Sequence, residues 1–90
     1  MIFDYVDFHT HLDFSPQQQY STTLECITQN RILTVASSVN IKSFKKNKIL
    51  ELKGANNLII PTFGIYPGYL NELPENEQEA VEILSEAGLL

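Results

Sequence analysis

The sequence predicts an α/β domain in which βαβαβα units build a parallel sheet. Three short apolar segments with strand character alternate with three longer segments that have helix character. The loops between them are short, and helices that connect consecutive strands imply parallel pairing with right-handed crossovers. Hydrophobic residues make up 43% of the 90 residues, which is ordinary for a globular chain. This length allows one small domain or part of a larger one.

The first predicted strand covers residues 5–11 and contains the pattern Asp7-x-His9-x-His11. Because side chains alternate along a strand, we expect these three residues on one face. Two imidazoles two residues apart on a rigid strand can reach one cation, and imidazole is a common ligand of zinc and related ions. His9 and His11 are therefore candidate metal ligands. The alternative interpretation is that they are ordinary residues of a half-exposed strand.

The first helix is predicted over residues 21–30, after a polar loop at residues 15–19. Ser21 or Thr23 is the expected N-cap, and Asn30 is expected to end the helix in the left-handed conformation. The expected buried stripe consists of Leu24, Cys26 and Ile27.

The second strand is predicted over residues 31–37. It is almost continuously apolar, which predicts a strand that is covered on both faces. A second helix is expected over residues 41–53, with Gly54 at its C-terminal end. The expected core contacts of this helix are Phe44, Ile49, Leu50 and Leu52. Its lysines form either an anion-binding face or a solvated face, and they are Lys42, Lys45, Lys46 and Lys48.

The third strand is predicted over residues 57–63, and Pro61 is expected to shorten or bend it. The loop at residues 64–69 follows. If the strands are parallel, this loop lies at the same end of the sheet as the two histidines. Tyr66 is then a candidate substrate-binding residue, with Tyr69 near it, and the alternative is that both tyrosines only pack.

The third helix is predicted over residues 75–84, and Gly88 is expected to close it. Glu75 and Glu77 near its start suit the helix dipole. The side chains expected to point inward are Ala80, Val81, Ile83 and Leu84. Leu89 and Leu90 resemble the beginning of a fourth strand. The sequence therefore predicts a fragment, a truncated product or a chain that a partner completes, with exposed edges at its outer strands.

The chain is acidic, with 6 basic and 11 acidic residues and a net charge of −5. This charge does not favour a broad electrostatic grip on nucleic acid or on an anionic membrane. A phosphate substrate stays possible, because a bound divalent cation would dominate the local field. The single cysteine, Cys26, excludes an internal disulfide and a two-cysteine zinc site. With no secretory signal and no apolar stretch of membrane-spanning length, we expect a cytoplasmic protein with no membrane partner.

Three segments carry a resemblance to a known family: Asp7-x-His9-x-His11-Leu12-Asp13, Leu33 to Ser38, and Gly64-Ile65-Tyr66-Pro67. In order and spacing, the sequence resembles the N-terminal portion of the TatD-type metal-dependent hydrolases of the amidohydrolase superfamily. The resemblance implies the first part of a (β/α)8 barrel of roughly 250 residues. It also implies one or two divalent cations (Zn, Mg or Mn), with His9 and His11 as ligands. Members hydrolyse phosphoesters, several of them DNA, through metal-activated water.

This chain departs from the family pattern in two ways. Tyr66-Pro67-Gly68 stands where the family usually has His-Pro-His, and the remaining family ligands belong to later strands. The resemblance therefore implies that residues 1–90 are an incomplete hydrolase domain that is inactive alone, with no catalytic residue assigned within it. The parent enzyme would act on DNA, another phosphoester or an amide. The alternative is a non-catalytic small α/β module, or a relic, completed by self-association through strand edges or by a partner.

Overall fold

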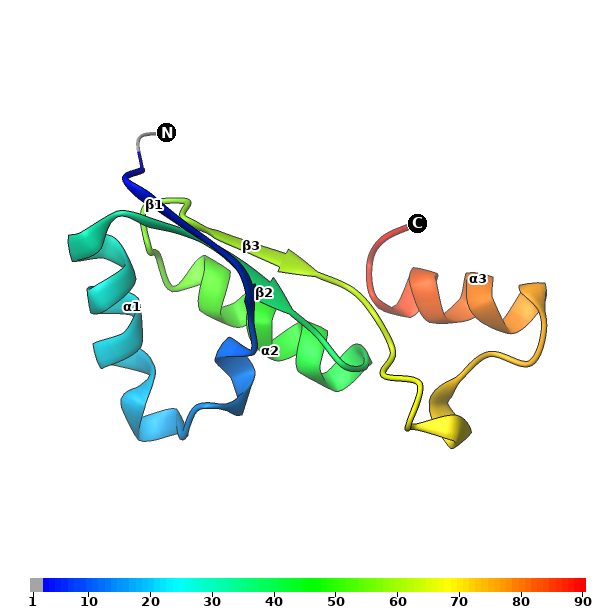
Figure 1. The fold of residues 1–90 in the computed structure, drawn as a ribbon. Helices are drawn as coiled ribbons and strands as arrows, with labels where there is room; N and C mark the ends of the chain where they lie inside the picture. The colour runs from blue at the N-terminus through cyan, green and yellow to red at the C-terminus, as the bar shows by residue number, and fades with distance from the viewer. Residues whose placement is uncertain (1–2) are drawn as a thin grey trace.

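A computed structural model describes residues 3–90 as a mixed α/β fold with a three-stranded parallel sheet (Figure 1). The strands are β1 (Tyr5–Thr10), β2 (Ile32–Ser37) and β3 (Ile59–Thr62), in the order β1-β2-β3. The helices are α1 (Tyr20–Asn30), α2 (Ile41–Leu52) and α3 (Glu77–Glu86), with short 3-10 turns at Leu12–Phe14, Gln17–Gln19 and Leu70–Glu72. The predicted α/β class and parallel pairing are confirmed.

Helices α1 and α2 lie on the same side of the sheet (Figure 1). On β2, Thr34 and Ala36 face them and are 2% and 0% exposed, whereas Leu33 and Val35 are only half-buried. The expectation that both faces of β2 are covered is therefore wrong. Connections of one hand place successive helices on one side of a sheet, so the other side stays open over the described residues.

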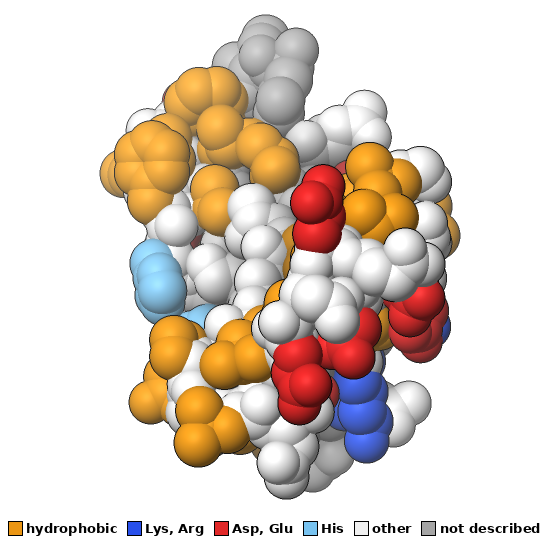
Figure 2. Space-filling model, turned by 90° about the vertical axis from the view of Figure 1, so that its right-hand side faces the viewer, with side chains coloured by type: hydrophobic (Ala, Val, Ile, Leu, Met, Phe, Trp, Pro, Cys, Tyr) orange, Lys and Arg blue, Asp and Glu red, His pale blue; other side chains and the backbone are white. Residues whose placement is uncertain are grey.

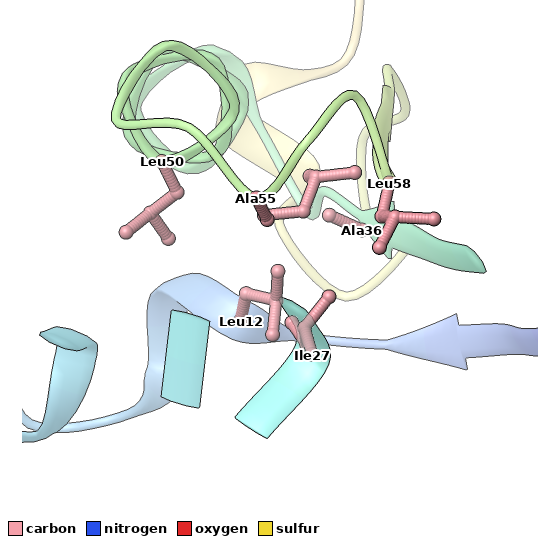
Figure 3. Close-up of a cluster of buried hydrophobic side chains, with 7 residues drawn as sticks. Leu12, Ile27, Ala36, Leu50, Ala55 and Leu58 are labelled. Carbon is pink, nitrogen blue, oxygen red and sulfur yellow. The ribbon is translucent and has the colours of Figure 1, made fainter. Parts of the chain in front are cut away.

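The hydrophobic core lies between the sheet and these two helices (Figure 3). Leu24 packs against this core and Phe44 is 3% exposed, as expected. The core side chains are Leu12, Ile27, Ala36, Leu50, Ala55, Leu58 and Ile59. Leu12 follows His11 directly, so the core fixes the chain immediately beyond the histidine motif.

Three side chains expected in the core are exposed. Ile49 is 54% exposed, Leu52 is 80% exposed, and the Cys26 thiol is also exposed. On α2 the buried positions are instead Ser43, Phe44, Asn47 and Leu50. Polar residues therefore occupy part of the inward face of this helix, so the apolar residues alone do not show its helical period.

Strand β1 contains an irregularity at the histidine motif. Asp7 aligns with Thr34 and Thr10 aligns with Ala36, so Phe8 and His9 together stand opposite Val35. Aligned residues of parallel strands share a face, so Asp7 lies on the helix side with Thr34. His11, the neighbour of Thr10, lies on the open side. The expectation that Asp7 shares a face with His9 and His11 is therefore wrong.

Strand β3 is short, and Pro61 lies within it. The N–H of Thr34 donates to the carbonyl of Leu58 at 2.7 Å, and Thr34 aligns with Ile59. The backbone N–H and C=O groups of Leu58 and Ile60 therefore point toward β2. The backbone nitrogen and C=O group of Ile59 and of Pro61 point toward the outer edge of the sheet. The N–H that proline lacks falls on that free edge, so no ladder hydrogen bond is lost.

The helix ends differ from the predicted ends by one or two residues. Gln19, rather than Ser21 or Thr23, precedes α1, and Arg31 rather than Asn30 adopts the left-handed conformation, with φ of 51°. Asn76 caps α3 by accepting a hydrogen bond from the N–H of Glu79 at 2.9 Å, so this helix begins later than expected. Gly88 closes α3 as expected, with φ of 78°.

Helix α3 lies away from α1 (Figure 1) and touches α2 through the ion pair between Lys45 and Glu86, at 3.5 Å. None of its residues is buried, and Val81 is 45% exposed, so the expected burial of Val81 is wrong. Leu89 and Leu90 are not part of a strand in the described residues, contrary to expectation. The helices of residues 3–90 are all too short or too polar to cross a lipid bilayer.

Candidate functional site

A groove of about 480 Å³ lies where the three parallel strands end, between the loops that follow them. Its lining residues are His9, His11, Phe14, Ser37, Ser38, Val39, Gly64, Ile65, Tyr66 and Tyr69. The backbone N–H of Tyr66 donates to the carbonyl of Val39 at 2.7 Å, which holds the third loop against the second. The expectation that the loop at residues 64–69 lies beside the two histidines is confirmed.

The imidazole of His11 is held in one orientation. Its Nδ1 lies 3.0 Å from the carbonyl oxygen of Ser37. A carbonyl oxygen only accepts, so in the neutral ring Nδ1 carries the proton and Nε2 keeps the lone pair. The ring of Phe14 stacks on the imidazole, with centroids 4.6 Å apart and planes 13° apart. A backbone carbonyl on the second nitrogen is the usual support of a metal-ligating histidine.

The imidazole of His9 lies beside that of His11. The two ring centroids are 5.0 Å apart and the planes are nearly perpendicular, at 86°. His9 is exposed, and its backbone N–H donates to Oδ1 of Asp7 at 3.1 Å. The carboxylate of Asp7 therefore bonds to the backbone of β1. The bulge in the strand thus separates Asp7 from the two histidines.

Imidazole is a suitable ligand for a divalent cation, but two imidazoles are fewer ligands than a catalytic metal site usually has. Within residues 3–90 no group of three His, Cys, Asp or Glu side chains is placed to hold a metal ion. Asp13, the acid that follows the motif, accepts a hydrogen bond from Nδ2 of Asn47 at 3.3 Å. Catalytic zinc sites usually have three protein ligands, which is one more than this pair of imidazoles supplies.

Asn47 supports the groove from behind, and it was not among the predicted site residues. Its side chain is fully buried, and its Nδ2 lies 3.1 Å from Oγ of Ser38 and 3.4 Å from the carbonyl oxygen of Ser37. The Ser37 carbonyl therefore has both Asn47 and His11 as neighbours. The signal in the sequence is an amide at a position where the helical period, set by Phe44 and Leu50, requires burial.

Tyr66 and Tyr69 form the far wall of the groove. Their rings meet edge to face with centroids 5.5 Å apart, and Tyr66 is 56% exposed. The ring of Tyr66 lies over Gly68, so a side-chain carbon at that position would overlap the ring, with Cδ2 only 2.9 Å away. Gly68 therefore gives the Tyr66 ring its place in the wall.

The lysines of α2 do not line this groove. Lys45 pairs with Glu86 at 3.5 Å, and Lys48 pairs with Glu51 at 3.1 Å, both between exposed side chains. Lys46 lines a separate hollow between α2 and the start of α1. The described residues that line the groove thus offer imidazole, hydroxyl and aromatic groups and no lysine or arginine.

A scan against protein-family models, a search of curated proteins and a search of solved structures each found no match to this chain.

Proposed function

We propose that this chain supplies the two-imidazole part of a divalent metal site in a TatD-type hydrolase that cleaves phosphodiester bonds. The observation that carries the proposal is the His9–His11 pair at the carboxyl end of a parallel sheet, with Nε2 of His11 left free. In (β/α)8 enzymes this end of the sheet is the catalytic face. Residues 1–90 are then the N-terminal part of the barrel, and DNA or another phosphoester is the substrate.

The chain's own residues have distinct tasks in this proposal. His9 and His11 hold the cation, Phe14 shields one face of the His11 ring from water, and Tyr66 contacts the substrate. A bound Zn²⁺, Mg²⁺ or Mn²⁺ supplies an activated water and neutralises charge on the phosphoester. With two of the three ligands that a catalytic zinc needs, the chain alone is inactive. A single cysteine fits a cytoplasmic enzyme.

The experiment is a calorimetric titration of the chain with Zn²⁺, followed by the same titration of His9→Ala and His11→Ala. We expect weak binding that falls by at least ~10-fold in either variant, because each removes one of two donors. Cys26→Ser is the matched control, because the exposed thiol is the other soft donor in the chain. Binding that survives both histidine variants and disappears in Cys26→Ser would contradict the proposed site.

A nuclease assay tests the second part of the proposal. Single- and double-stranded DNA are incubated with the 90-residue chain and Mg²⁺, Mn²⁺ or Zn²⁺, and no cleavage is expected above the His9→Ala background. Sustained turnover that His9→Ala abolishes would show that two ligands suffice and that the inactivity prediction is wrong.

The second candidate function is that of a non-catalytic α/β module. The observation that favours it is the uncovered face of the sheet, which no helix of the described residues covers. If the calorimetric titration shows no heat of zinc binding, and the chain makes a specific protein–protein contact through that face, the module is favoured over the hydrolase.

A further inference from the structure

The hollow between α2 and the start of α1 is separate from the groove that holds the two histidines, and the two share no lining residue. Its volume is about 380 Å³, which is in the range of small-molecule sites in proteins. In the proposed barrel, α1 and α2 are consecutive neighbours on the outer surface, so no later helix comes between them. The residues that line the hollow are Asp13, Ser15, Gln17, Tyr20, Lys46, Ile49, Leu50 and Lys53.

Helix α2 contributes one continuous stripe to this hollow. The stripe has the spacing i, i+3, i+4 and i+7, which places its side chains on one face of a helix. Leu50 is 2% exposed and belongs to the core, whereas Ile49 is 54% exposed. A lysine therefore stands at each end of an apolar strip that is partly open to solvent. The four residues are Lys46, Ile49, Leu50 and Lys53.

The two lysines of the hollow, Lys46 and Lys53, form no ion pair with any carboxylate of residues 3–90. Lys45 and Lys48 on the same helix each pair with a glutamate. In Figure 2, which views the molecule from the side of α3, the basic side chains in sight also lie beside acidic ones. Two ammonium groups at one hollow thus keep their charge for an external anion, in a chain that has 11 acidic residues.

The acidic residue of the hollow, Asp13, already has hydrogen-bond partners. Its Oδ1 accepts from Nδ2 of Asn47 at 3.3 Å, and its backbone carbonyl accepts from the hydroxyl of Tyr20 at 3.2 Å. The hydroxyl of Ser15 and the side-chain amide of Gln17 add two neutral donors to the lining. With two positive charges against one negative charge, the lining favours an anion that has several acceptor oxygens.

We infer that this hollow binds a small phosphomonoester with an apolar body. A phosphomonoester carries a charge of roughly −1.5 to −2 at pH 7 and three acceptor oxygens, which match two ammonium groups and two neutral donors. A carboxylate has one charge and two oxygens and uses fewer of these groups. Lysine is a common phosphate ligand, and its flexible stem lets two ammonium groups converge on one phosphate. The apolar body then lies against Ile49 and the ring of Tyr20.

This inference goes beyond the proposed function and needs no metal ion. The test is an NMR titration of the metal-free 90-residue chain with phenyl phosphate, with inorganic phosphate as the comparison probe. We expect saturable shifts of the backbone amides of Ser15, Gln17 and Tyr20. Phenyl phosphate should bind at least ~5-fold more tightly than inorganic phosphate, because only the phenyl ring covers the apolar strip.

Variants of α2 locate the site. Lys46→Gln and Lys53→Gln should each raise the dissociation constant of phenyl phosphate by at least ~5-fold, because each removes one charged donor. Lys42→Gln is the matched control, because it removes the same charge from an exposed lysine of the same helix that does not line the hollow. At physiological salt it should change the constant by less than ~2-fold. Ile49→Ala should weaken phenyl phosphate by about 3-fold and leave inorganic phosphate unchanged.

Four results would overturn the inference. The absence of saturable shifts would show that the hollow binds no phosphomonoester, and equal weakening in Lys42→Gln and Lys46→Gln would indicate unspecific attraction to a solvated lysine face. Shifts confined to His9, His11 and Tyr66 would place the anion in the groove. Benzoate bound as tightly as phenyl phosphate would assign the hollow to carboxylates. All the variants change exposed side chains, so we expect them to stay folded, and circular dichroism checks this.

Discussion

The side-chain amide of Asn47 donates to Oδ1 of Asp13 at 3.3 Å, across 34 residues of sequence. The same nitrogen also lies 3.1 Å from Oγ of Ser38. One buried amide on α2 thereby joins the loop after β1 to the loop after β2, and these loops form two walls of the groove.

Replacing Asn47 tests this connection. Asn47→Ala should lower the free energy of unfolding by about 1–3 kcal/mol, because three acceptors lose one buried donor. Asn47→Asp should lower the free energy of unfolding further at neutral pH, since it places a carboxylate beside Asp13 and two further acceptors. Urea unfolding of both variants measures the difference. An aspartate variant as stable as the unaltered chain would show that the nitrogen is not the important atom.

Truncation of Leu12 should lower the stability of the chain strongly, whereas truncation of Leu52 should hardly change it. Leu12→Ala should cost about 2–5 kcal/mol, because this 6% exposed side chain belongs to the core directly after His11. Leu52→Ala should change stability by less than ~0.5 kcal/mol, because the side chain is 80% exposed. Chemical denaturation of the two variants makes the comparison, and equal losses of stability would mean that the Leu52 side chain is packed and not exposed.

The ion pair between Asp4 and Arg31 should make stability depend on pH in the acid range. The Arg31 guanidinium donates two hydrogen bonds to the carboxylate, at 2.6 and 2.9 Å. These bonds lower the pKa of Asp4 in the folded state. The stabilisation is therefore complete above the unfolded pKa of about 3.9 and is lost as pH falls through the lower folded value.

Asp4→Asn should accordingly be less stable than the unaltered chain at neutral pH, and the difference should shrink as the solution is acidified. Thermal unfolding at a series of pH values follows it. Glu25→Gln is the control, because it removes an exposed carboxylate that accepts a hydrogen bond from Gln29 on the same helix. A constant difference across the acid range would rule out the linkage to Asp4.

Gly68→Ala should displace the ring of Tyr66 without unfolding the chain. The added methyl group overlaps the ring, which is the flexible end of an exposed side chain and can rotate away. NMR shifts of the Tyr66 and Tyr69 rings should change, because their edge-to-face contact is lost. Gly64→Ala is the control, because its nearest neighbour would be the Ser38 carbonyl at an ordinary 3.4 Å. Equal ring shifts in both variants would contradict this role of Gly68.

Local patterns in the sequence were sufficient to predict the alternation of strands and helices, and hence the end of the sheet where His9, His11 and Tyr66 meet. Parallel pairing follows from connection length, and the groove follows from parallel pairing. The glycines in the left-handed conformation after α2 and α3 could also be predicted, since a positive φ at a helix end favours glycine.

The errors arose where polar groups replaced apolar ones in tertiary contacts. Asn47 is buried because it bonds to two loops, and no pattern along α2 shows those partners. Leu52 is 80% exposed because its side of α2 faces away from the core that buries Leu50. The separation of Asp7 from His9 and His11 has a different origin, because strand alternation assumes a regular register and the bulge at Phe8 and His9 interrupts it.

The irregularity in β1 has a consequence for the placement of chemistry in this molecule. A regular strand continuing from Asp7 would set His9 opposite Ala36, on the face of the sheet that α1 and α2 cover. Because β1 has one extra residue at Phe8–His9, every side chain after the bulge points to the face opposite the one that a regular strand would give it. One residue of length, rather than any change of side chain, decides that the histidines look outward.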